Sequence, residues 1–200
     1  MAIKTTFRVS SSNPDNDPER EDFPLSDFDH IPNRCYTLVS LTFNLEEEDD
    51  RQVIIDNLII GLQRTLSQYR SLRGTLQSDV ATGRLWIREY KHSTVEFTTN
   101  WIDGPEDDFP SFEALEMTDF PAAMLDGDSL LPSHVTRKET LPRGGNGDNV
   151  PVLVAQANFI PGGLILALAV HHSCSDGMHH SSLSYCPKVV ANMNTSNCLE

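Results

Sequence analysis

Two apolar runs near the C-terminal end dominate the hydrophobic pattern, over residues 152–160 and 163–170. The second run is apolar at every position after its first glycine, which is typical of a strand buried on both faces. A Pro-Gly-Gly turn signal separates the two runs, so together they predict a β-hairpin. The residues directly after this hairpin, 171–177, are therefore expected to emerge from the end of a core strand.

Upstream, the pattern predicts one strand and one long helix. Residues 35–45 are rich in β-branched and aromatic side chains, which favours a strand. After an acidic run, apolar side chains recur every four residues, which defines one face of a helix. Asp49 and Gln52 have the spacing of a capping box, and Gly74 follows the cationic end of the helix. The helical positions are Ile54, Leu58, Leu62, Leu66 and Tyr69.

Shorter elements complete the expected organisation. A hairpin is predicted at 75–77 and 84–89, a strand at 95–98, and a short helix at 111–117. Residues 1–22 are polar and are expected to form a flexible N-terminal arm, with a short strand at 3–9. Residues 23–178 are predicted to form a single α/β domain with a mixed sheet and helix cover. Residues 179–200 lack helical spacing and contain Pro187, so they are expected to be a disordered or truncated tail.

Composition and charge narrow the function. The 200 residues are 38% hydrophobic and 22% charged, as in a globular chain, and the formal net charge is -14. Such an acidic chain is a poor candidate for binding nucleic acid or anionic membranes. We see no stretch apolar enough to span a bilayer and no signal peptide. The four cysteines lack metal-site spacing and are expected to be free thiols, which favours the cytoplasm.

The candidate chemistry lies in the stretch His171-His172-Ser-Cys-Ser-Asp176-Gly177. Imidazole titrates near neutral pH, so a histidine here can take a proton from a hydroxyl or amine that attacks an acyl carbonyl. His172 with Asp176 is the preferred catalytic pair, and Asp176 would hold the loop or the ring. Gly177 would allow a tight backbone path beside it.

Two other interpretations of this stretch remain open. A zinc or iron site could draw on His171, His172, Asp176, His179 and His180, although no recognised metal signature is present, and no metal is predicted. Alternatively, His179, His180 and His171 are ordinary histidines in or beneath a loop. Cys174 and Ser175 do not lie in a nucleophile-elbow pattern, so no covalent nucleophile is assigned.

The same stretch resembles the HHxxxDG signature of the chloramphenicol-acetyltransferase-like superfamily, which includes the BAHD acyltransferases. The Gly-Gly-containing strand before it and the stretch Leu25-Ser-Asp-Phe-Asp29, which resembles the LSxxD element, strengthen the likeness. The sequence around the motif is most similar to fungal trichothecene 3-O-acetyltransferase-like proteins. The resemblance covers about residues 20–178, which corresponds to the N-terminal domain of a normally two-domain enzyme.

This resemblance implies transfer of an acyl group from acyl-CoA to a hydroxyl or amine of a small-molecule acceptor, with no resident cofactor. His172 matches the general base and Asp176 the structural aspartate. Gly177 matches the glycine beside the acyl-donor channel, and His171 lies in the same substrate loop. The DFGWG motif of the second domain is absent, and the residues that bind the co-substrate stay unknown. The chain is therefore expected to be incomplete or inactive alone, with a missing C-terminal domain or partner chain.

Two alternatives follow from this departure. The chain could assemble like chloramphenicol acetyltransferase, with its site completed between subunits of an oligomer. It could instead be a non-catalytic binding or interaction module, whose exposed apolar surface attracts a partner.

Overall fold

A computed structural model describes residues 3–125, 127–135 and 150–174 of the chain. Nine strands, three α-helices and five short 3₁₀ turns are formed within these residues. The strands are β1 Ile3–Val9, β2 Arg20–Pro24, β3 Tyr36–Asn44, β4 Thr75–Ser78, β5 Leu85–Tyr90, β6 Val95–Trp101, β7 Val150–Pro151, β8 Leu153–Ile160 and β9 Gly163–His171. The helices are α1 Arg51–Gln68, α2 Phe112–Met117 and α3 Gly127–Leu130. The 3₁₀ turns are η1 Pro14–Asn16, η2 Asp27–His30, η3 Arg70–Arg73, η4 Ala122–Met124 and η5 His172–Cys174.

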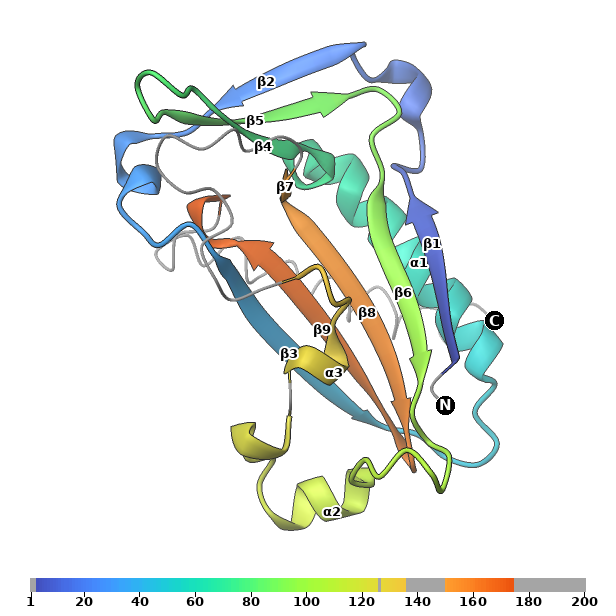
Figure 1. Ribbon diagram of the computed structural model, residues 1–200. Coiled ribbons are helices and arrows are strands. Elements are labelled where there is room, and N and C mark those ends of the chain that lie inside the picture. The colour runs from blue at the N-terminus through green and yellow to red at the C-terminus, as the bar shows by residue number, and fades with distance from the viewer. Residues whose placement is uncertain (1–2, 126, 136–149, 175–200) are drawn as a thin grey trace.

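The strands form two sheets (Figure 1). The larger sheet has the order β1-β6-β8-β9-β3, in which only β6 and β8 run parallel. The smaller sheet, in the order β2-β5-β4-β7, lies across one end of the larger one. The predicted mixed sheet with helix cover is confirmed, as are the hairpins β8–β9 and β4–β5. The second sheet was not foreseen as a separate layer.

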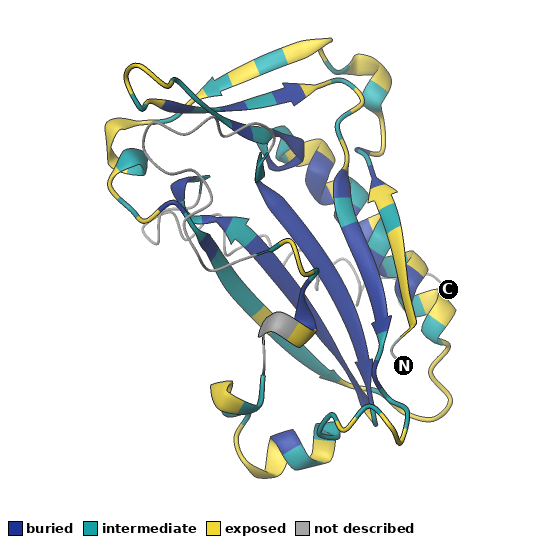
Figure 2. Cartoon of the chain, in the orientation of Figure 1, coloured by how far each residue is buried: buried dark blue, intermediate teal, exposed yellow. Residues whose placement is uncertain are grey.

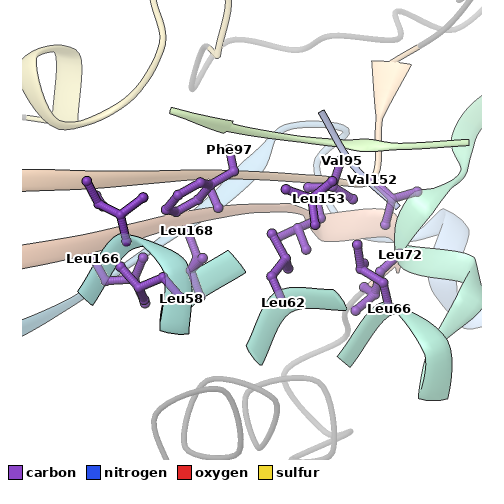
Figure 3. Packing of buried hydrophobic residues seen from close by; sticks show 14 of the residues in the cluster. Leu58, Leu62, Leu66, Leu72, Val95, Phe97, Val152, Leu153, Leu166 and Leu168 are labelled. Atoms are coloured by element: carbon purple, nitrogen blue, oxygen red, sulfur yellow. The ribbon is translucent and has the colours of Figure 1, made fainter. Parts of the chain in front are cut away.

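Helix α1 covers one face of the larger sheet with the apolar side that its sequence predicted. Leu58, Leu62 and Leu66 are buried against side chains of β6, β8 and β9, as Figure 3 shows. The capping box expected at Asp49 is wrong by one residue. Asp50 is the N-cap, and its side chain accepts hydrogen bonds from the backbone amides of Gln52 and Val53. The Asp49 carboxylate instead accepts from the amide of Glu46.

The central hairpin is buried on both faces, as its continuous apolar pattern predicted. Every residue of β8 is buried, and all but one of β9 (Figure 2). Gly162 makes the connecting turn possible, because its φ of 70° lies in the left-handed region that favours glycine. One face of the hairpin packs under α1. The opposite face packs on a second cluster that includes Tyr36, Ile165 and Leu130.

The segment expected to be a flexible arm instead belongs to both sheets. β1 pairs antiparallel with β6, and β2 pairs with β5. The polar residues that suggested a loose arm bind a buried guanidinium: Arg73 donates to Ser11 Oγ at 2.8 Å and to Asp17 Oδ2 at 2.6 Å. Arg73 also pairs with Glu89, whose side chain is fully buried. Since a buried charge needs partners, these polar residues are part of the fold.

No helix within the described ranges combines the length and apolar character needed to cross a membrane. The expected tail at 179–200 lies outside the described residues. The domain boundary at 178 also lies there, so the predicted division into domains stays a prediction.

Candidate active site

The two adjacent histidines lie where the central strand ends. His171 is the last residue of β9, and it pairs with Tyr36, the first residue of β3. His172 opens the 3₁₀ turn η5 directly after the strand. The His171 amide donates to the Val152 carbonyl at 2.9 Å, and the His172 amide donates to the Cys35 carbonyl at 2.8 Å. The backbone of the pair is thus held from both sides, by the residues that directly precede the two flanking strands.

The His171 side chain is fully buried, with 0% of the residue exposed. Its Nδ1 accepts a hydrogen bond from the Ser173 amide at 3.3 Å. Burial, and secondarily the neighbouring His172, lower the pKa of His171 to about 4, while a hydrogen bond with the Arg34 backbone opposes the shift. His171 is therefore a neutral imidazole near pH 7.

This position corrects one expectation from the sequence. His171 was predicted to lie in a loop that contacts substrate, but it continues the inward-facing row of Ile165, Ala167 and Ala169 along β9. Because side chains alternate along a strand, the residue after Val170 points back into the protein. His171 therefore has the environment of a supporting residue.

His172 differs from its neighbour in burial. The residue is partly exposed. Its Nδ1 is buried without a hydrogen-bond partner among the described residues. The ring therefore keeps a nitrogen that no described side chain engages. Asp176 and Gly177, predicted to hold and to open this loop, lie outside the described residues, so their roles stay predictions.

The other two residues of η5 are not suited to nucleophilic attack. Ser173 is fully buried, and its Oγ has no hydrogen-bond partner in the described part of the chain. Burial, and secondarily the charge of Asp29, raise the pKa of the Cys174 thiol well above its usual range. A protonated thiol is a weak nucleophile. The environment of Cys174 agrees with assigning it no nucleophilic role, whereas Ser175, the other residue of that expectation, lies outside the described residues.

The described residues do not test the metal interpretation as a whole. Across residues 3–125, 127–135 and 150–174, no three histidine, cysteine or acidic side chains come together as a possible metal site. Asp176, His179 and His180, three of the five candidate ligands, lie outside those ranges.

A shallow pocket of about 360 Å³ lies between η2 and the β4–β5 turn, and His30, Arg34 and Arg84 line it. Both guanidiniums already have protein partners: Arg34 donates to the Gly83 carbonyl at 2.7 Å, and Arg84 pairs with Asp27. The pocket therefore does not by itself identify residues that bind an acyl donor.

Comparison with known proteins decides the family. Residues 35–185 match the model of the trichothecene 3-O-acetyltransferase-like N-terminal domain. The chain belongs to this family. The resemblance inferred from the histidine motif is thereby confirmed at the level of the family.

Two curated relatives illustrate the likeness. Acetyltransferase FGR3 of Gibberella zeae is 38% identical over 172 residues, which cover 82% of this chain and 33% of the relative. Trichothecene 3-O-acetyltransferase TRI101 of Fusarium sporotrichioides is 30% identical over 148 residues, which cover 70% of this chain and 31% of the relative. The chain thus spans about a third of the length of these relatives.

Solved structures share the fold. F. graminearum TRI101 complexed with coenzyme A and T-2 mycotoxin superposes with a TM-score of 0.72 at 20% identity, covering 88% of this chain and 40% of that chain. F. sporotrichioides TRI101 complexed with coenzyme A and T-2 has a TM-score of 0.70 at 25% identity, and the match covers 88% of this chain and 39% of that chain. The predicted acyltransferase-type α/β fold, as one part of a larger enzyme, is confirmed.

No pattern in the sequence indicated which residues hold the histidine pair. Arg34, Cys35 and Tyr36 each contact it, but they are more than 130 positions away along the chain. Only the pairing of β3 with β9 brings them together. A correct pairing of those two predicted strands would have been enough to find them.

Proposed function

We propose that this chain is the histidine-bearing part of a CoA-dependent acyltransferase and that His172 is its general base. The observation that carries the proposal is the difference in exposure between the two histidines. His171 is fully buried, whereas His172 is partly exposed on a turn whose backbone is hydrogen-bonded to Cys35, directly before β3. A general base must be both positioned and accessible to the group it deprotonates. Family membership and the acetyltransferase names of the relatives support the reaction class.

The proposed step is an acyl transfer to a hydroxyl or amine of a small molecule. The His172 imidazole takes the proton of the acceptor hydroxyl as that oxygen attacks the thioester carbonyl carbon. The carbon–sulfur bond then breaks, and the proton passes from His172 to the departing CoA sulfur. The products are the acyl ester and free CoA, and the histidine returns to its neutral form.

The remaining roles are carried over from the family motif. We propose that Asp176 holds the loop or the His172 ring and does not touch substrate, and that Gly177 permits a close backbone path beside the acyl donor. Acyl-CoA is proposed as a co-substrate, which the coenzyme A in the TRI101 complexes supports.

We place the protein in the cytoplasm. The described cysteines, Cys35 and Cys174, are both free thiols. Unpaired thiols are usual where the surroundings are reducing.

Binding and transfer by the chain test this proposal together. Titration calorimetry measures binding of acetyl-CoA, and a thiol reagent follows CoA release in the presence of hydroxylated acceptors. Because the chain spans about a third of the length of its relatives, both are measured with the chain alone and with the remaining part of FGR3 supplied as a separate chain. We expect saturable binding, and we expect His172→Ala to lower the transfer rate by about 10²–10⁴-fold, as for loss of a general base. His134→Ala, which removes an exposed histidine outside the candidate site, is the control and should leave the rate unchanged.

Two results would overturn the proposal. One is equal transfer by the wild-type chain and by His172→Ala. The other is a folded wild-type chain, verified by circular dichroism, that neither binds acetyl-CoA nor releases CoA even when the remaining part of FGR3 is supplied as a separate chain.

A further inference from the structure

Three consecutive residues, Arg34 to Tyr36, contact the two histidines and support them. The backbone of Arg34 hydrogen-bonds with His171. The carbonyl of Cys35 accepts from the His172 amide at 2.8 Å. The ring of Tyr36 meets the His171 ring edge-on, with 5.5 Å between centroids and 74° between planes. One short segment therefore controls the backbone of one histidine and the ring of the other.

The His171 ring in turn fixes the turn that carries His172. Its Nδ1 accepts the amide proton of Ser173, two residues on, so the hydrogen-bonded ring includes the whole backbone of His172. A rotation of the His171 imidazole would break this bond and release the 172–173 peptide. The contact acts as a side-chain cap on η5, comparable to the caps that satisfy free amides at helix starts.

Tyr36 is itself fixed at two points. Its backbone pairs with His171 across the β3–β9 ladder. Its hydroxyl donates to the Pro151 carbonyl at 2.7 Å. Pro151 belongs to β7, which pairs with β4 in the smaller sheet. The Tyr36 ring is thus held between the two sheets and leaves the His171 ring little room to rotate, because packed side chains in a core occupy single orientations.

Burial supports this arrangement. Tyr36 is only 6% exposed, and burial raises the pKa of its phenol, so the hydroxyl stays protonated and able to donate. The lowered pKa of His171 likewise keeps Nδ1 free to accept. The two hydrogen bonds, from the Tyr36 hydroxyl to Pro151 and from the Ser173 amide to His171 Nδ1, therefore each have their donor and acceptor in the required protonation state near neutral pH.

We propose that Tyr36 is a positioning residue for His172, acting through the His171 ring and the hydrogen bond from Ser173. The inference rests on the proposed function, because it assigns Tyr36 to the orientation of the proposed base. Tyr36 does not touch substrate; it keeps the η5 turn in the one conformation that presents the His172 ring.

Two substitutions of Tyr36 should disturb the position of His172 to different degrees. Tyr36→Phe keeps the ring and removes only the hydroxyl that donates to Pro151. Tyr36→Leu also removes the ring that faces His171. Tyr90→Phe, at a residue that is 51% exposed, is the matched control for loss of a phenolic hydroxyl. Circular dichroism and thermal unfolding establish that each variant is folded before its histidines are compared.

The first readout does not depend on activity. Diethyl pyrocarbonate modifies accessible neutral imidazoles, and peptide mapping by mass spectrometry separates the seven histidines of the chain. We expect the modification rate of His172 to change by about fivefold in Tyr36→Phe, the effect of one hydrogen bond worth about 1 kcal/mol. The change should be larger in Tyr36→Leu and absent in Tyr90→Phe. A purely structural role would raise the modification of every histidine together.

The second readout is the acyl transfer itself. Tyr36→Phe should lower kcat by about fivefold with little change in the KM for acetyl-CoA, because a misaligned base weakens the chemical step and not donor binding. Unchanged modification of His172 in both folded Tyr36 variants would overturn the positioning role, whatever the activity. Absence of transfer in the wild-type chain, with the modification pattern as expected, would instead count against the proposed function alone.

Discussion

The two faces of the larger sheet are built from the same strands but differ in chemistry. The face under α1 carries large apolar side chains, among them Phe97, Phe159 and Leu166. The opposite face carries the buried amides Asn100, Gln156 and Asn158, and at its end Tyr36 and His171. Side-chain alternation sends neighbouring residues of one strand to opposite faces. A single hairpin therefore supplies the main apolar core on one side and supports the candidate base on the other.

This comparison predicts that the α1 face dominates stability. Leu66 has no exposed surface. Leu66→Ala should lower the free energy of unfolding by about 2–5 kcal/mol, the cost of lost burial and of the remaining cavity. Urea denaturation followed by circular dichroism measures it. Ile60→Ala, on the outer side of the same helix and 43% exposed, is the control, and an equal loss in both variants would contradict the assignment of the core.

The opposite face should make stability depend on acidity. Because the pKa of His171 falls from 6.5 to about 4 on folding, the unfolded chain binds the additional proton between these values. The free energy of unfolding therefore has its full value with respect to His171 above pH 6.5. It decreases by about 3 kcal/mol as the pH falls toward 4. The comparison is between wild type and His171→Asn, each unfolded in urea at pH 7 and pH 4. If the two proteins lose the same free energy of unfolding on acidification, the burial of a neutral His171 is wrong.

The buried amides of that face should contribute less than the apolar core. Asn158 Oδ1 accepts from Asn100 Nδ2 at 2.9 Å and from Gln156 Nε2 at 2.7 Å. Asn158→Leu keeps the branched shape and the number of heavy atoms of the side chain but leaves those two donors without this acceptor, at a cost of about 1–3 kcal/mol. The matched change Asn44→Leu, at the exposed end of β3, should stay within about 0.5 kcal/mol. An unchanged free energy of unfolding for Asn158→Leu in urea denaturation would show that the amide cluster does not matter for stability.

The smallest expected effect concerns the start of α1. Asp50 caps the first turn through two amides, so Asp50→Ala should destabilise by about 1 kcal/mol. Glu48→Ala, in the same exposed acidic run, should have almost no effect. Thermal unfolding of the two variants measures the difference. Equal melting temperatures would contradict the observed cap.

Local patterns predicted the elements but not how they meet. The hairpin at 152–170, the apolar face of α1 and the β4–β5 hairpin follow from periodicity and turn residues within short windows. The position of residues 3–22 could not be predicted, because Arg73, which binds Ser11 and Asp17, and the partner strands β5 and β6 are distant in the sequence. A polar composition indicates a flexible arm unless a buried charge elsewhere requires those polar groups.

The candidate site shows the same division. The motif identified His172, but two adjacent histidines look alike in a sequence. Burial separates them, and burial depends on the register that places Tyr36 opposite His171. The support from Arg34, Cys35 and Tyr36 is likewise non-local.

The central claim is that His171 is a buried neutral acceptor supporting the turn that presents His172. The most direct test is a proton NMR titration of the ring Cε1–H resonances of the folded chain, with His171→Asn used to assign the His171 signal. The account predicts that His171 titrates with a pKa of about 4. A midpoint near 6.5 in the folded protein would show a solvent-accessible ring, and it would contradict both the supporting role of His171 and the positioning of His172 through it.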